Sequence, residues 1–294
     1  MSRPPTTAMA YPSPRALLER HGLHAKKSWG QNFLGDEAIL DDIARLAVRR
    51  PGEPVVELGA GLGHLTARLL ARGAAVTAVE RDRDMARVLR AELGDRIRLL
   101  EADAARLDYA ALAADAAAVA GAPGGPPPRL AVVGNLPYHL TSPILFSLLD
   151  QVAHVARAVF LVQREVAERL AASPGEEAWG LPSVLLQREA EVSVERIVPP
   201  GAFHPPPRVH SAVVLAELRP PLEPVLDPAR FRKLVKAGFA QRRKTLRNAL
   251  EAARLAPAEA LTRALTAAAI DPGRRGETLT VAEWCALERA LGPA

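Results

Sequence analysis

Cysteine is nearly absent from this sequence, since Cys285 is the only one in 294 residues. A single cysteine excludes a framework of intramolecular disulfides and is typical of a protein kept in a reducing compartment. Long apolar runs are absent as well: none reaches the roughly 18 residues of a membrane-spanning helix, and the N-terminal stretch lacks the apolar region of a secretory signal. We therefore expect a cytoplasmic protein with no membrane contact.

Several common catalytic and binding signatures are also missing. His204 and His210 flank a run of prolines, but together with the lone cysteine they do not form a ligand set with the spacing of a metal site. The sequence has neither a Gly-x-Ser-x-Gly elbow nor a phosphate-binding P-loop. The sequence therefore predicts no metal centre, no hydrolase of that elbow type and no P-loop nucleotide hydrolase.

Acidic residues are absent from one stretch, 228–250, which holds eight basic ones, while the whole chain has a net charge of +5. The chain has only five lysines, and they fall in two places, Lys26 and Lys27, then Lys233, Lys236 and Lys244. Such clustering is typical of proteins that bind a polyanion such as a nucleic acid. A solvated helix face in an arginine-rich protein explains the charge equally well at this point.

Short apolar runs alternate with helical patterns from residue 54 onward, which predicts a mostly parallel sheet covered by helices. Two late runs break this alternation and favour a C-terminal antiparallel hairpin. The expected strands are 55–58, 76–80, 97–100, 130–133 and 159–162, with the hairpin at 191–198 and 209–218. A proline-rich stretch at 219–228 then precedes helical patterns at 231–250, 257–269 and 281–291. We expect a flexible tail at 1–24, an α/β domain at 25–219 and a small all-α domain at 220–294.

Three of the expected strands end in residues suited to holding a nucleoside. Glycines at 59, 61 and 63 follow the first strand, and Gly59 lets the backbone approach a ligand closely. Glu80 ends the second strand, where a carboxylate can hold ribose hydroxyls, and Asp103 ends the third, where it can accept from an adenine amino group. Without a site for phosphates, this set favours S-adenosylmethionine. Each acidic residue alone is also compatible with an ordinary helix cap.

The fourth strand leads into Asn135, Leu136, Pro137 and Tyr138. An exocyclic adenine amine is a poor nucleophile because its lone pair is delocalised into the ring. The Asn135 side-chain carbonyl and a neighbouring backbone carbonyl, which we assign to Leu136, could accept its two hydrogens and free that lone pair. Tyr138 could stack on the base, and Phe203, beside a proline run, could supply a second stacking surface. The alternatives are an Asn-Pro turn that caps a helix and a Phe that plugs the end of the sheet.

In these motifs the chain resembles the KsgA/RsmA family of small-subunit rRNA adenine N6-dimethyltransferases. The resemblance runs from about Lys26 to the C-terminus. The motifs are GQNFL at 30–34, ELGAG at 57–61, NLPY at 135–138, QREV at 163–166, FHPPPRV at 203–209 with Ser211, and QRRKTLRN at 241–248. The chain departs from the family at three places. Trp29 stands where the family usually has Phe, His139 follows the NLPY tyrosine, and GAPGGPPP at 121–128 resembles an insertion.

The resemblance implies a Rossmann-like class I methyltransferase domain at 25–219. It also implies an enzyme that places two methyl groups on each of two adjacent adenines near the 3′ end of 16S rRNA. The substrate would be the immature 30S subunit, and we expect the enzyme to be a monomer. Residues expected to contact S-adenosylmethionine are Asn32, Leu34, Gly59, Glu80, Asp103 and Asn135; those expected at the target adenine are Asn135, Leu136, Tyr138 and Phe203. Residues expected to bind RNA are Lys26, Lys27, Arg242, Arg243, Lys244 and Arg247.

Two other functions stay open at this point. The first is the related antibiotic-resistance enzyme that dimethylates an adenine of large-subunit rRNA; the FHPPPRV and QRRKTLRNAL segments favour the small-subunit enzyme. The second is a ribosome-assembly or RNA-binding factor without catalysis. The intact glycine turn, Glu80 and the NLPY motif argue against it.

Overall fold

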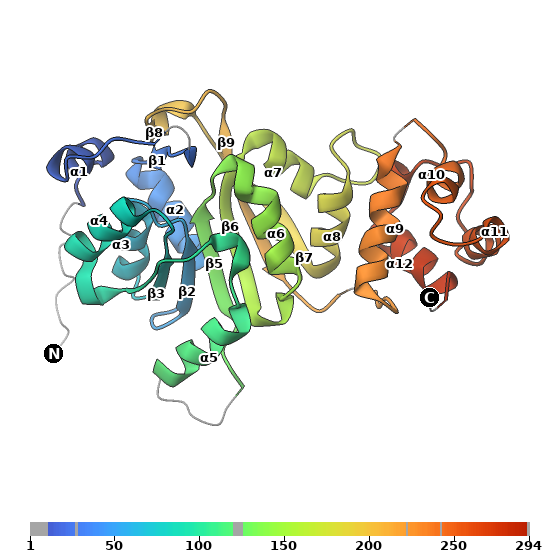
Figure 1. Cartoon of the computed structure of the whole chain (residues 1–294), viewed down its shortest axis with the longest axis horizontal. Helices are drawn as coiled ribbons and strands as arrows, with labels where there is room; N and C mark the ends of the chain where they lie inside the picture. The colour runs from blue at the N-terminus through green and yellow to red at the C-terminus, as the bar shows by residue number, and fades with distance from the viewer. Residues whose placement is uncertain (1–10, 27–28, 120–125, 222, 242, 293–294) are drawn as a thin grey trace. The chain divides into compact units, whose positions relative to one another are not determined.

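The computed structural model describes residues 11–26, 29–119, 126–221, 223–241 and 243–292. Within these ranges seven strands form one sheet in the order β4-β3-β2-β5-β6-β9-β7 (Figure 1). The parallel strands are β2 (Pro54–Leu58), β3 (Ala75–Val79), β4 (Arg98–Leu100), β5 (Leu130–Asn135) and β6 (Val155–Gln163). β9 (Ser211–Leu218) runs antiparallel to β6, and β7 (Ala190–Val198) lies beside β9. The mostly parallel sheet is confirmed, as is the antiparallel strand at its C-terminal end.

Helices cover the sheet because its strands are apolar on both faces. On one face α2 (Glu37–Ala47) and α3 (His64–Ala71) bury Ile43 and Leu69 against Val55, Val133 and their neighbours. The other helices that follow strands are α4 (Arg83–Leu93), α5 (Tyr109–Val119) and α6 (Thr141–Leu149). Each βα turn therefore brings the carboxyl end of a strand and the start of a helix to the same edge of the sheet.

The N-terminal region contributes two elements that support this edge. Helix α1 (Pro14–Arg20), inside the segment expected as a tail, is capped by Ser13 and buries Leu17 and Leu18 in a cluster with Leu62. A two-residue strand, β1 (Phe33–Leu34), then pairs with β8 (Phe203–His204). This strand could not be predicted from the sequence, because two residues are too few to show an alternation of side chains.

Contacts divide the chain into two compact units, residues 1–164 with 194–218, and residues 165–193 with 219–294. The second unit therefore includes a segment that we had expected within the α/β domain. Its helices are α7 (Arg164–Ala171), α8 (Leu181–Glu189), α9 (Pro228–Ala240), α10 (Leu246–Ala252), α11 (Ala258–Ala267) and α12 (Val281–Ala290).

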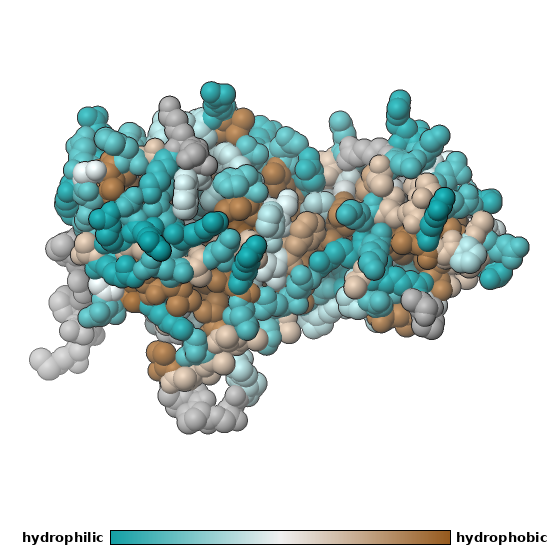
Figure 2. Space-filling model, in the orientation of Figure 1, coloured by the Kyte–Doolittle hydropathy of each residue, from teal (hydrophilic) through white to brown (hydrophobic). Residues whose placement is uncertain are grey.

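Hydrophilic side chains cover much of the face shown in Figure 2, with apolar patches between them.

One helix prediction was wrong. The expected helix at 231–250 is two helices, because Gln241 leaves the helical region (φ −131°, ψ 74°) and Thr245 caps a new helix by accepting from the Asn248 backbone N–H. The Thr245-x-x-Asn248 spacing of a helix start was the missed signal. Among the described residues no helix has the length and apolar character to cross a membrane.

Candidate active site

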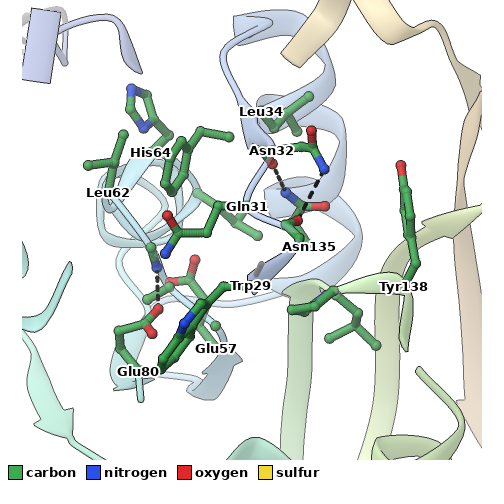
Figure 3. A pocket seen from close by; sticks show the side chains of 18 of the residues that line it. Trp29, Gln31, Asn32, Leu34, Glu57, Leu62, His64, Glu80, Asn135 and Tyr138 are labelled. Atoms are coloured by element: carbon green, nitrogen blue, oxygen red, sulfur yellow. Dashed lines mark hydrogen bonds between the residues drawn. The ribbon is translucent and has the colours of Figure 1, made fainter. Parts of the chain in front are cut away.

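A cavity opens at the carboxyl edge of the sheet, where β2, β3 and β5 end (Figure 3). Its open space, mouth included, is about 870 Å³. A second hollow of about 810 Å³ adjoins it and shares Trp29, Gly59, Glu80, Leu136 and Pro137. Further residues of the main cavity come from the segment before β1, the glycine turn and the NLPY motif: Gln31, Asn32, Leu34, Glu57, Leu62, His64, Asn135 and Tyr138.

The glycine turn presents bare backbone to the cavity. Gly59 (φ +69°) and Gly61 (φ +56°) adopt conformations that favour glycine, and the Gly59 N–H donates to the Val79 carbonyl at 2.8 Å. A Cβ built on Gly59 would meet nothing within 4 Å, so open space lies against its backbone. A ligand can therefore approach the main chain here.

Glu80 is fastened to the glycine turn. Its Oε2 accepts from the Gly61 N–H at 2.8 Å and its Oε1 from the Asp82 N–H at 2.7 Å. The side chain is buried, and this burial raises the pKa of Glu80 above its usual range. Each carboxylate oxygen keeps a further lone pair that can accept from a hydroxyl of a ligand.

Glu57 is a second buried carboxyl group in the cavity wall. Thr66 Oγ1 donates to its Oε2 at 2.6 Å, and burial raises the pKa of Glu57 to about 8. The carboxyl group is therefore mostly protonated at neutral pH. In the sequence Glu57 stands out only as part of the glycine motif. Its position directly after Val55 and Val56, within an apolar strand, was the available signal.

Asn135 is oriented by a remote part of the chain. Its Nδ2 donates to the Asn32 backbone carbonyl at 2.8 Å, a contact drawn in Figure 3. Because a carbonyl must face the NH₂ group, the amide orientation is fixed and the Asn135 Oδ1 is left as the acceptor. Asn32 and Leu34 both line the cavity, and Leu34 is buried.

Tyr138 lines the cavity, while Phe203 lies elsewhere. The Tyr138 hydroxyl is 2.9 Å from the hydroxyl of Ser211, which is fully buried at the start of β9. Burial raises the pKa of Tyr138, so its hydroxyl stays protonated. Phe203 is only 6% exposed, pairs with Leu34 through β8 and does not line the cavity. A stacking role for Phe203 stays a prediction.

The remaining predicted residues lie in different surroundings. Asp103 lines the adjoining hollow, and its Oδ1 accepts from the Ala105 N–H as a helix cap does. Lys26 Nζ pairs with Asp82 and Asp84, each at 2.7 Å. Arg247 Nε pairs with Glu251 at 2.7 Å, and Arg243 and Lys244 are exposed in the second unit. Lys27 and Arg242 lie outside the described residues.

Within the described ranges no group of three or more His, Cys, Asp or Glu side chains is placed to hold a metal ion. His64, the histidine of the cavity wall, has its Nε2 2.8 Å from the Pro12 carbonyl, to which it donates, and burial lowers the pKa of His64 to about 4. It is therefore a neutral part of the wall at physiological pH.

Comparison with known proteins identifies the family. Residues 22–291 match the family described as ribosomal RNA adenine dimethylase. The chain belongs to this family. It is 77% identical to ribosomal RNA small subunit methyltransferase A of Anaeromyxobacter sp. (strain K), over 96% of this chain and 99% of that protein. Its identity to the Myxococcus xanthus protein of the same name is 54%, over 96% of each chain.

Solved structures agree with the fold of the dimethylase family. The 23S rRNA methyltransferase ErmE is 27% identical, covers 89% of this chain and all of its own, and superposes with a TM-score of 0.65. A dimethyladenosine transferase from Plasmodium falciparum, 21% identical, has a TM-score of 0.68 over 87% of this chain and 95% of its own. The predicted family, enzyme class and Rossmann-like methyltransferase fold are therefore confirmed.

Proposed function

We propose that this enzyme transfers methyl groups from S-adenosylmethionine to the exocyclic amines of two adjacent adenines near the 3′ end of 16S rRNA. The substrate is the immature 30S subunit, and the enzyme acts as a monomer. The observation that carries the proposal is Asn135, whose amide is held by Asn32 so that an acceptor oxygen is left at the rim of the cavity that also contains Glu80.

The residues at the cavity fit S-adenosylmethionine. The bare backbone at Gly59 admits a ligand, Glu80 accepts from ribose hydroxyls, and Asp103 in the adjoining hollow accepts from an adenine amine. Among the described residues that line the main cavity there is no Lys or Arg, which suits a ligand without phosphates. When bound, S-adenosylmethionine supplies an electrophilic methyl group. Asn32 and Leu34 complete this part of the wall.

The target adenine is handled by the NLPY residues. The Asn135 Oδ1 and the Leu136 carbonyl accept the two hydrogens of the amine, which favours a pyramidal nitrogen with a free lone pair. Tyr138 stacks on the base, a contact worth roughly 1–3 kcal/mol. The proton released after methylation passes to water, so the protein supplies no titratable base.

The RNA partner is inferred from the relatives and from charge. The relatives at 77% and 54% identity are named as small-subunit enzymes, whereas ErmE, named as a 23S enzyme, is 27% identical. The helical segment 220–294 supplies basic residues for the RNA backbone, among them Arg243 and Lys244. Lys26 is a weaker candidate for RNA contact because two carboxylates already balance its charge.

The test offers the purified enzyme labelled S-adenosylmethionine with either 30S subunits that lack the modification or protein-free large-subunit rRNA. We expect transfer to the 30S subunits only. Transfer to the large-subunit rRNA alone would support the antibiotic-resistance type of activity. No transfer to either, in an assay where a known dimethyltransferase succeeds, would support a non-catalytic assembly factor.

A further inference from the structure

Trp29 stands at the mouth of the site without an assigned function. It lies in the segment before β1 and lines both the main cavity and the adjoining hollow. Its side chain is 41% exposed, although tryptophan is a costly residue to leave in water. The other two tryptophans, Trp179 and Trp284, are fully buried in the second unit. Trp29 is therefore the tryptophan that a ligand in either hollow could cover.

The segment that carries Trp29 is fastened at the carboxyl end of β3. Lys26 Nζ bonds Asp82 and Asp84, and the Gln31 Nε2 donates to the Asp82 Oδ2 at 2.8 Å. Asp82 in turn donates its backbone N–H to Glu80. These contacts hold the residues on either side of Trp29 next to the carboxylate that we assign to the ribose.

The indole ring is held by cations at this position. Lys26 Nζ lies 5.6 Å and Arg81 Cζ 5.8 Å from the ring centroid, within the range of cation–π attraction. Arg81 lies just after the end of β3, and Lys26 is paired there with Asp82 and Asp84. In Figure 3 Trp29 lies beside Glu80, while Tyr138 stands well apart from it. The ring is thus placed toward the Glu80 side of the cavity and away from the proposed target base.

We infer that Trp29 covers the adenosine of the methyl donor by stacking on its base. This assignment rests on the proposed use of S-adenosylmethionine. The hollow that contains Asp103 is lined by Leu136, Leu140 and Ile144 as well as by Trp29. A planar base in this hollow would have apolar side chains and an indole ring as its neighbours, with Asp103 and its ion-pair partner Arg81 at its polar edge. Lys26 accordingly positions the indole ring.

The inference is tested by fluorescence together with calorimetry. The product S-adenosylhomocysteine is titrated into the full chain while acrylamide quenching of tryptophan emission is followed. We expect quenching to fall on binding, and we expect Trp29→Phe to remove this ligand-dependent change while calorimetric affinity stays close to wild type. Trp29→Ala should weaken affinity by about 10-fold or more, as loss of one stacking partner does. Trp284→Phe is the control, and it should leave the ligand-dependent change intact.

The two possible failures are distinguishable. Calorimetric binding with unchanged quenching, or a Trp29→Ala variant that binds like wild type, would overturn the role of Trp29 and leave the proposed function standing. Absence of calorimetric binding to the wild-type chain would overturn both. Thermal unfolding of the two Trp29 variants should match that of wild type to within the effect of an exposed substitution, because Trp29 lies outside the hydrophobic core.

Discussion

The donor side and the target side of the cavity are held together in different ways. On the donor side, hydrogen bonds join residues close in sequence: Glu80 bonds the backbone of Asp82 and Gly61, 2 and 19 positions away, and Thr66 bonds Glu57 over 9 positions. On the target side, Asn135 is held by Asn32 over 103 positions and Tyr138 by Ser211 over 73. The two carboxyl groups of the donor side are therefore positioned by two βα units, whereas Asn135 and Tyr138 on the target side depend on distant segments.

This difference has a functional meaning. The donor side uses backbone N–H groups and buried carboxylates, which keep their geometry as long as β2 and β3 remain paired. The target side uses side chains, each oriented by one partner from elsewhere in the chain. Changes on the donor side should therefore alter the affinity for the donor, while changes on the target side should alter the methyl transfer step.

Replacing Asn135 should have the largest effect. We expect Asn135→Ala to lower kcat by about 10²–10³-fold, the loss found for one preorganised hydrogen-bonding group. The affinity for 30S subunits should change little, because the change leaves the basic residues of the second unit untouched. Methyl-transfer kinetics and filter binding measure the two quantities. Equal losses of transfer and RNA binding would contradict the role of Asn135.

Replacing Glu80 should act on the donor instead. Glu80→Gln turns an NH₂ group toward one of the two backbone N–H groups that the carboxylate now accepts from. Loss of charged hydrogen bonds of this kind predicts a donor affinity weaker by roughly 10–100-fold in calorimetry. Glu101→Gln is the matched control, since Glu101 follows β4 but pairs with Arg90 at the surface. A kcat loss at saturating donor, with normal affinity, would contradict the division into two sides.

The buried Glu57 should be visible in the pH dependence of stability. Its pKa is raised to about 8 in the folded protein from an ordinary value of 4.5, so the folded state binds the proton more tightly. Wild-type stability should therefore fall as pH rises from about 4.5 to 8. Glu57→Gln cannot ionise and can still accept from Thr66. The free energy of unfolding of this variant should exceed that of wild type by about 2 kcal/mol or more at pH 8.5. The difference should disappear at pH 5, and urea unfolding measures it at both pH values. Parallel pH profiles would place the raised pKa in doubt.

Removing the hydrogen bond between Tyr138 and Ser211 should have the smallest effect on activity. Ser211→Ala removes one hydrogen bond, worth ~1 kcal/mol, and should lower kcat/KM for the RNA substrate by about 5-fold. Tyr138→Phe should have a similar effect, and the double variant should be no worse than either single one, because both remove the same bond. Fully additive losses would show that the two hydroxyls act separately.

The same contrast explains what could be predicted from the sequence. Gly59, Glu80 and Asp103 were found because each follows a strand whose apolar run is visible in the sequence. The supports of Asn135 and Tyr138 were not found, since nothing local links residues 32 and 135 or residues 138 and 211. Only the family resemblance had assigned a function to Asn32.

The remaining differences have equally physical causes. The β1 and β8 pair is two residues long on each strand, which is too short for a periodic pattern. Lys26 was assigned to RNA because the few lysines are clustered. Its ion pairs with Asp82 and Asp84 could not be predicted, because these residues lie far along the chain. The boundaries of the two units at residues 164 and 194 could not be predicted from the sequence either. Residues 165–193 belong to the second unit, but the chain then adds β7 and β9 to the sheet.

The most direct test maps the methylated nucleotides. Unmodified 30S subunits are incubated with the enzyme and labelled S-adenosylmethionine, and the 16S rRNA is digested and analysed by mass spectrometry. The proposed function predicts N6,N6-dimethyladenosine at two adjacent positions near the 3′ end, formed far more slowly by Asn135→Ala. Label on another base, or at a position outside the 3′-terminal region, would contradict it.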